Sequence, residues 1–182
     1  MEAFWRIYFV ESGIGWAMIG AMMAVMFGGV GSAFGIRIAG AQAGGALSEK
    51  PELFGKLLIL MALPGTQGFY SFIIAVFVAS KTGLLAGKPL CTPIQGIGLL
   101  FVGICAGIVE WRSAVYQGEA SAAAISMTAR RPDQAGRSIL IPALVETYAV
   151  VALLASILFI TWIMGIQPAA APVAPIVPPV AP

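Results

Sequence analysis

Residues 132–146 read PDQAGRSILIPALVE and repeat the pattern of residues 51–65, which read PELFGKLLILMALPG. Proline, an acidic residue, glycine, a basic residue and the pair Ala-Leu recur in the same register. Because such a repeat indicates a doubled structural unit, we expect two helical hairpins of the same orientation in tandem. The repeat also aligns Glu146 with Gly65, so that only the second hairpin carries a carboxylate at this position.

The composition indicates an integral membrane protein. Of the 182 residues, 59% are hydrophobic and 10% are charged, and the mean hydropathy is +0.94. A soluble domain would carry about a quarter charged residues. The net charge of +2, without any basic run, argues against a nucleic-acid partner, and the absence of histidine excludes histidine-based catalysis and histidine metal sites. Cys91 and Cys105 form no CxxC motif, and we predict no disulfide.

Four long apolar segments predict the fold class. Each one exceeds the roughly 20 residues that a helix needs to cross a bilayer. Helices are expected because backbone polar groups cannot be left unpaired in lipid. We therefore predict an all-α membrane protein with four transmembrane helices in two tandem hairpins. The predicted spans are residues 13–47, 53–80, 94–129 and 133–166.

The chain divides into five parts. Residues 1–12 are rich in aromatic side chains and lack the pattern of a cleaved signal, which predicts an interfacial helix. The first hairpin covers residues 13–81, an outer loop covers 82–93, and the second hairpin covers 94–166. Residues 167–182 are rich in proline and are expected to form an extended appendage outside the core.

Basic residues predict the orientation. The first and third connections together carry five of them, against three on the other side of the membrane. The positive-inside rule then places these two connections in the cytoplasm and both termini outside. The five are Lys50, Lys56, Arg130, Arg131 and Arg137, and the three are Arg6, Lys81 and Lys88.

Glu146 lies in the middle of the last apolar segment. A charge near the centre of a bilayer costs at least about 2.5–3.5 kcal/mol, and such residues usually serve a function. Gln117 lies about as far before the third connection as Glu146 lies after it. In an antiparallel hairpin the two side chains should therefore share one height, roughly 20 Å from the connection.

The second span offers a polar face at the corresponding height of the repeat. Leu63, Thr66, Gln67 and Tyr70 follow the i, i+3, i+4, i+7 spacing of one helix face. Three helices thus offer polar groups at one level, and their oxygens suit a hard cation rather than a soft metal. Pro64 frees the carbonyl one turn before it, which leaves open a plain kink or a carbonyl that faces an ion.

Three motifs carry a resemblance to a known family. They are LPGTQGFYSF at 63–72, YQGEASAAA at 116–124 and ALVETYA at 143–149. Together they resemble the four-helix proteolipid of V-type rotary ATPases, especially its sodium-translocating bacterial members. The resemblance covers residues 13–166. It implies a membrane-embedded, ring-forming rotor subunit that does no ATP chemistry itself.

The resemblance also implies a Na+ site, with protons competing for its carboxylate. In the relatives, a glutamate binds the ion, three side chains and one backbone carbonyl add oxygens, and a tyrosine holds the carboxylate. The matching residues here are Glu146 for the carboxylate, Thr66, Gln67 and Gln117 for the side-chain oxygens, Leu63 for the carbonyl and Tyr70 for the hydrogen bond.

The implied setting is the inner membrane of a bacterial cell. The expected partners are copies of this chain or single-hairpin proteolipids in a ring, a stator subunit with an essential arginine, central-stalk subunits at the cytoplasmic loops, and lipid. The unusual termini leave open a V-type host or a sodium F-type ATP synthase with a mixed ring. Two alternatives to the Na+ rotor also remain: a proton-translocating ring subunit, and a self-contained carrier or pore, against which the parallel repeat argues.

The third span contains further polar and small residues. Glu110 is expected to pair with Arg112 or to face the lumen of a ring, with a second ion site as the less favoured alternative. Ser113 and Ser121 are expected to make helix–helix contacts. The glycines at small-residue spacings predict close helix packing, and they are Gly28, Gly31, Gly35, Gly103 and Gly107.

Overall fold

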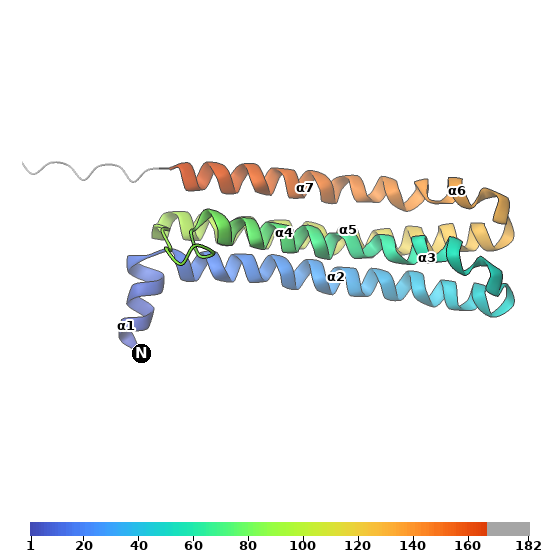
Figure 1. Ribbon diagram of the computed structural model, residues 1–182, viewed down its shortest axis with the longest axis horizontal. Coiled ribbons are helices and arrows are strands. Elements are labelled where there is room, and N and C mark those ends of the chain that lie inside the picture. The colour runs from blue at the N-terminus through green and yellow to red at the C-terminus, as the bar shows by residue number, and fades with distance from the viewer. Residues whose placement is uncertain (167–182) are drawn as a thin grey trace, which may run out of the picture.

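Four long helical spans run side by side in the computed structural model, which describes residues 1–166 (Figure 1). Each span is long and apolar enough to cross a membrane, and each begins and ends within two residues of its predicted bounds. The predicted all-α fold of two tandem hairpins is confirmed. The elements are α1 (Glu2–Trp5), η1 (Arg6–Glu11), α2 (Ile14–Glu49), η2 (Pro51–Leu53), α3 (Phe54–Ala62), η3 (Leu63–Gly65), α4 (Thr66–Lys81), α5 (Pro93–Arg130), η4 (Pro132–Gln134), α6 (Ala135–Ser138) and α7 (Leu140–Gly165).

The sequence repeat is visible in how the second and fourth spans begin. Both open with a three-residue 3-10 helix that starts at a proline, Pro51 in η2 and Pro132 in η4. Proline suits this place because its missing N–H would have no partner in the first turn of a helix. Both spans are then interrupted again near a second proline, at Pro64 and just before Pro142.

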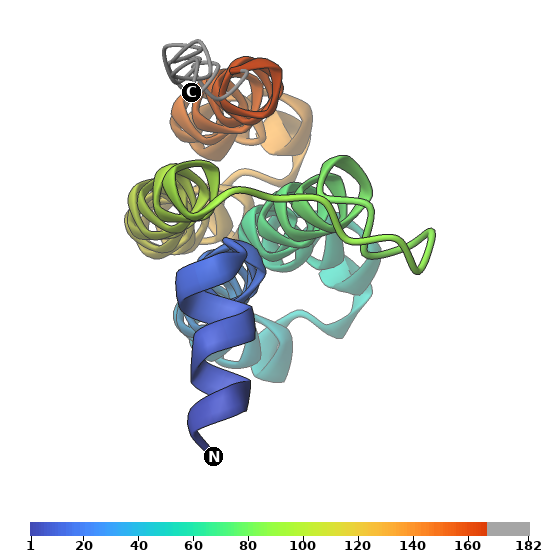
Figure 2. The same ribbon diagram turned by 90° about the vertical axis from the view of Figure 1, so that its left-hand side faces the viewer.

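The helices are arranged around a central pair. Figure 2 shows α2 and α7 on opposite sides of α4 and α5. α2 packs along α5 and α4, and α7 packs along the same two helices. Each buried face is therefore shared between the two hairpins, and the bundle interior has contributions from all four spans.

Glycines bring α2 and α5 into close contact, as the sequence predicted. A Cβ atom at Gly103 would lie 2.0 Å from the carbonyl oxygen of Gly20, and one at Gly118 would lie 2.5 Å from Cα of Gly35. Side chains at these positions would push the two helices apart. The contact thus fixes how α5 is rotated against its neighbours, and with it the direction in which the α5 side chains point.

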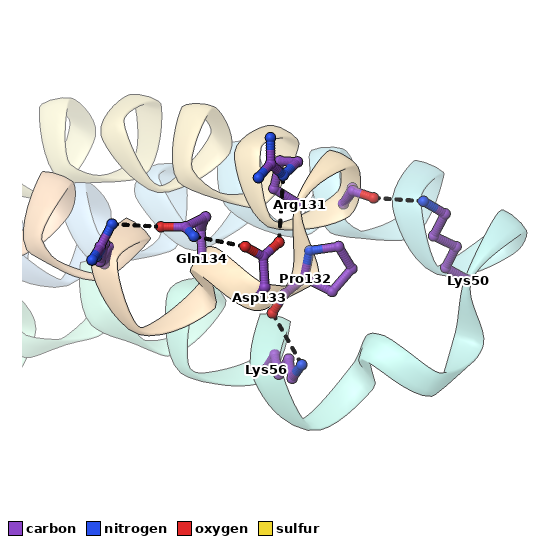
Figure 3. A network of polar contacts seen from close by, with 8 residues as sticks. Lys50, Lys56, Arg131, Pro132, Asp133 and Gln134 are labelled. Atoms are coloured by element: carbon purple, nitrogen blue, oxygen red, sulfur yellow. Dashed lines mark hydrogen bonds and ion pairs between the residues drawn. The ribbon is translucent and has the colours of Figure 1, made fainter.

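Polar contacts tie the two hairpins together at one end of the bundle and join the two helices of the second hairpin at the other. Lys50 Nζ donates a 2.7 Å hydrogen bond to the carbonyl of Ala129, and Lys56 Nζ donates a 3.1 Å bond to that of Pro132 (Figure 3). At the opposite end, Thr92 and Gln95 form a capping box at the start of α5. The Gln95 amide also donates to the carbonyl of Ile166 at 2.9 Å.

The N-terminal segment is helical, and Figure 1 shows it turning away from the long axis of the bundle. Its rings gather into a cluster that reaches Trp16, whose Nε1 donates a 3.1 Å hydrogen bond to the carbonyl of Phe9. Its interfacial position stays a prediction. The proline-rich tail, 167–182, lies outside the described residues. Cys91 and Cys105 are both free.

Candidate ion-binding site

Pro64 shapes one wall of the candidate site. The helix α3 ends at Ala62, the 3-10 turn η3 spans Leu63–Gly65, and α4 starts at Thr66. A proline cannot donate to the carbonyl one turn earlier, and the tighter turn accommodates that loss. The carbonyl of Leu63 accepts a 3.0 Å hydrogen bond from the Thr66 hydroxyl. The backbone at Pro64 therefore forms a defined turn with a polar group at its end.

The predicted site residues of α4, α5 and α7 form one hydrogen-bonded chain. The Thr66 hydroxyl donates to Oε1 of Gln67 at 3.3 Å, and Nε2 of Gln67 donates to Oε1 of Gln117 at 2.6 Å. Nε2 of Gln117 donates to Oε2 of Glu146 at 3.4 Å. The hydroxyl of Tyr70 closes the chain by donating to Oε1 of Glu146 at 2.6 Å. All of the residues selected from the sequence spacing thus lie together.

Burial differs systematically along this chain of hydrogen bonds. Gln67 and Gln117 are completely buried. Thr66, Tyr70 and Glu146 are partly exposed. The carboxylate therefore lies at the edge of the bundle, where another molecule can reach it, while the two amides lie behind it in the interior.

Ser113 belongs to the site, although the sequence predicted only a helix contact for it. Its hydroxyl accepts a 3.3 Å hydrogen bond from Nε2 of Gln67 and donates a 3.4 Å bond to the carbonyl of Val145. It thus connects α4 with α7. The signal was present in its spacing, because Ser113 precedes Gln117 by four residues and so shares its face of α5.

No basic side chain among residues 1–166 forms an ion pair with Glu146. The ion pairs of the described residues, Arg6–Glu11 and Arg131–Asp133, both lie at the ends of the bundle. A carboxylate inside a membrane needs a compensating positive charge or a proton. The site surrounds Glu146 with neutral hydroxyl, amide and carbonyl groups, so compensation by a small cation fits this set of ligands.

The predicted partnership between Glu110 and Arg112 is wrong. Arg112 is exposed, and its guanidinium stacks 4.8 Å from the centroid of the Tyr116 ring, whose hydroxyl it also hydrogen-bonds. Glu110 is completely buried between the helices. Neighbouring positions on a helix point in different directions, and residues two apart point nearly to opposite sides. The alternative expectation, that Glu110 faces the lumen of a ring, is also not met, because its side chain is buried inside the bundle of this one chain.

The sequence model of the ATP synthase C-subunit family matches this chain twice, at residues 19–78 and 100–159. Each match covers most of one hairpin, so the family comparison finds the same repeat as the sequence and the structure.

Among curated proteins, the chain is similar to a "V-type sodium ATPase subunit K" of Enterococcus hirae, with 34% identity over 82% of this chain and 93% of the relative. It is also similar to an "A-type ATP synthase subunit K" of Methanocaldococcus jannaschii, with 32% identity over 78% of this chain and 60% of the relative. A "V-type proton ATPase 16 kDa proteolipid subunit" of Chrysotila carterae is 31% identical over 50% of this chain and 56% of the relative. The chain therefore belongs to the ATP synthase C-subunit family, as a doubled form in which each hairpin matches the family once.

Proposed function

We propose that the chain is a rotor-ring subunit that carries Na+ across the membrane on Glu146. The observation that supports the ion site is the cluster of oxygen ligands from three helices around a carboxylate without a basic partner. Family membership supports the rotary role. The chain is a non-catalytic, membrane-embedded, ion-translocating subunit of a rotary ATP synthase or ATPase, because both halves belong to the C-subunit family.

The proposed ligands are Glu146, the side-chain oxygens of Thr66, Gln67 and Gln117, and the carbonyl of Leu63. They belong to the hydrogen-bonded chain, in which Gln117 turns its Nε2 toward Glu146 and its Oε1 toward Gln67, so the Gln117 amide has to rotate to present its oxygen to a cation beside Glu146. A dehydrated Na+ ion requires several oxygens to replace its water shell. A proton requires only the carboxyl group, and extra buried polar groups cost about 1–3 kcal/mol each when they are left unpaired.

The names of the relatives include both a sodium ATPase subunit and a proton ATPase subunit, so proton translocation is the second candidate function. The E. hirae relative is a sodium ATPase subunit and the C. carterae relative is a proton ATPase subunit. The sodium relative aligns over 82% of this chain and the proton relative over 50%. Together with the ligand set, this supports Na+, with protons as competitors that neutralise Glu146.

The position of the carboxylate suggests how the ion is exchanged. Glu146 is partly exposed while Gln67 and Gln117 are buried, so an ion can enter and leave from the outer surface of the bundle. A stator subunit that presents an arginine there would displace Na+ by pairing with Glu146. We propose that the stator provides two half-channels, one open to each side of the membrane, and that between them the loaded site is neutral and can pass through lipid. The membrane potential contributes about 2.3 kcal/mol per charge for each 100 mV.

The arrangement of the helix ends supports a common side of the membrane for the start of α2 and the end of α7. We place this chain in a ring with further copies or with single-hairpin proteolipids, in the inner membrane of a bacterial cell. Figure 1 shows the start of α2 and the end of α7 at the same end of the bundle, and both termini are proposed to lie outside. The opposite end, with Lys50 and Lys56, would face the central stalk in the cytoplasm.

Binding of radioactive Na+ to the purified ring tests the proposed function. We expect saturable binding in the wild type and its loss in Glu146→Gln. Glu119→Gln is the matched control, because Glu119 is an exposed carboxylate of α5 and should leave binding unchanged. Unaltered Na+ binding by Glu146→Gln would refute the assigned site.

A further inference from the structure

Two opposite charges are exposed within the membrane-spanning helices α2 and α5. Arg37 lies on α2 and Glu119 on α5, and neither belongs to an ion pair among residues 1–166. The guanidinium of Arg37 lies 4.9 Å from the centroid of the Phe34 ring. Charged side chains inside a membrane nearly always face protein or a water-filled cavity, and they pair with one another. These two charges therefore indicate a face of the chain that another protein covers.

The internal repeat predicts how a second copy of the chain would pack. The two family matches align residue 19 with residue 100, so each position of α2 has a counterpart on α5. If the next copy continues the arrangement of the two hairpins, its α2 packs on α5 as α5 packs on α2 within one chain. A contact between two different faces generates a ring when the rotation between neighbours closes.

The closest contact of α2 with α5 fixes the register of this packing. Within the chain, a Cβ atom at Gly118 would lie 2.5 Å from Cα of Gly35. In the repeat, the counterpart of Gly35 is Tyr116, and the position whose counterpart is Gly118 is Arg37. The same contact between two chains therefore places Arg37 of one copy against Tyr116 of the other. Both side chains are exposed in the single chain.

The apolar residues of the two faces fit the same register. The contact of Gly20 with Gly103 becomes a contact of Phe101 with Met22, which are 62% and 64% exposed. Phe101 also lines an apolar groove between α5 and α7, which a flexible methionine side chain can fill. Large side chains here replace pairs of glycines, so the helices of two copies would lie further apart than α2 and α5 of one chain. This spacing leaves room for long charged side chains.

The charges around Tyr116 are complementary to Arg37. Glu119 follows Tyr116 by three residues and shares its face of α5. An extended arginine side chain reaches further than one helical turn of about 5.4 Å, so Arg37 opposite Tyr116 can meet the Glu119 carboxylate. Arg112 lies one turn to the other side of Tyr116, and its guanidinium already stacks on that ring. Repulsion from Arg112 directs Arg37 toward Glu119.

We propose that Arg37 of one copy of this chain pairs with Glu119 of the next copy, inside the membrane. The exposed faces of α2 and α5 are then the contact between consecutive copies. The inference rests on the proposed ring, and it names the partner at this face as a second copy of the chain rather than a single-hairpin proteolipid. Each contact removes two exposed charges from lipid and replaces them with one hydrogen-bonded pair.

Cross-linking between cysteines tests the register. A chain with Arg37→Cys and Tyr116→Cys, in which Cys91 and Cys105 are replaced by serine, is treated in membranes with a short, membrane-permeant bifunctional thiol reagent. We expect a ladder of dimers and larger products on a denaturing gel. The control combines Arg37→Cys with Phe69→Cys and should stay monomeric, because Phe69 is an exposed residue of α4 away from this face. An assembled ring of the first variant that gives no ladder overturns the proposed contact.

Reversing the charges tests the ion pair. Arg37→Glu and Glu119→Arg each place like charges opposite one another, so both rings should dissociate to monomers on a native gel in mild detergent. The double variant, Arg37→Glu with Glu119→Arg, should recover more ring than either single variant. Glu119→Gln keeps an oxygen that accepts from Arg37, so it should assemble and remain suitable for Na+ binding. A double variant that is no more assembled than the single variants overturns the pair.

The outcomes separate this inference from the proposed function. A wild-type ring that contains one copy of this chain among single hairpins overturns the contact between copies and leaves the Na+ site in place. A wild-type ring that cross-links as expected but binds no Na+ overturns the Na+ site alone. A wild-type chain that enters no ring at all overturns both.

Discussion

The hydroxyl of Tyr70, on the first hairpin, donates a 2.6 Å hydrogen bond to Oε1 of Glu146, on the second. The first hairpin has Gly65 where the repeat would place an acid, yet it supplies Thr66 and Gln67 to the same cluster. One site is therefore formed by side chains from both hairpins. Neither hairpin contains the carboxylate and all of its polar neighbours.

Removing a proposed ligand should weaken Na+ binding much more than protonation. Gln117→Leu and Thr66→Val each delete an oxygen but leave Glu146 able to take a proton. Loss of a buried hydrogen-bonding group costs about 1–3 kcal/mol, so Na+ affinity should fall by about tenfold or more. The measurement is Na+ binding to the purified ring at fixed pH. Equal losses of Na+ and proton affinity would contradict the ligand assignment.

Tyr70→Phe should have a milder effect than either ligand substitution. Tyr70 holds the carboxylate through its hydroxyl and is not a proposed ligand of the ion. The phenyl ring keeps the apolar contacts, so the change isolates one hydrogen bond. We expect a decrease in Na+ affinity of up to about tenfold in the same binding assay. A loss as large as that of Glu146→Gln would mean that Tyr70 has a direct role in binding.

One ion is expected for each chain of four spans. Glu146 is the proposed ion carboxylate, and the first hairpin has Gly65 at the equivalent position. Native mass spectrometry of the intact ring shows which chains it contains and how many of each, and a parallel measurement of bound Na+ gives the ions per ring. In a ring made only of this chain, an ion count equal to the number of hairpins would contradict the shared site.

The contact between α2 and α5 predicts which glycines tolerate a side chain. Gly103→Ala would place Cβ 2.0 Å from the carbonyl oxygen of Gly20, so we expect a loss of stability of about 1–3 kcal/mol from overpacking. Gly44→Ala is the control, because nothing lies within 4 Å of its added Cβ. The melting temperature of the purified protein should fall for the first and stay equal or rise for the second.

The proposed orientation can be tested with cysteines in the loops. An impermeant maleimide added to intact cells should label Lys88→Cys in the outer loop but not Arg131→Cys in the third connection. Native Cys91 should contribute little, because burial raises the pKa of its thiol to about 11 and keeps it protonated near neutral pH. Both engineered cysteines should react after solubilisation. The opposite pattern in cells would place the termini in the cytoplasm.

The spans and most of the site could be predicted because they depend on periodicities within the sequence. The lengths of the apolar segments predicted the four helices, and the internal repeat aligned the second span with the fourth. The i, i+3, i+4, i+7 spacing selected Leu63, Thr66, Gln67 and Tyr70, since it is a property of one helix. The common height of Gln117 and Glu146 in the membrane was predicted by counting residues on either side of the third connection.

The environment of Glu110 could not be predicted in the same way. Its burial depends on how α5 is rotated against α2, α4 and α7. That rotation is fixed by contacts between helices, such as Gly103 against Gly20, which no spacing within one helix reveals. The same rotation brings Ser113 to Gln67 rather than leaving it at a simple packing contact.

Carbodiimide labelling of Glu146 tests the Na+ site most directly. The reagent modifies a protonated carboxyl, so a bound cation should protect Glu146 from it. In the wild-type ring near neutral pH, we expect labelling at Glu146, with Glu110 unlabelled because it is completely buried. Millimolar Na+ should slow the labelling while K+ at the same ionic strength does not. If Na+ gives no more protection than K+, or if the label is on Glu110 or Glu119, Glu146 is not a Na+ site.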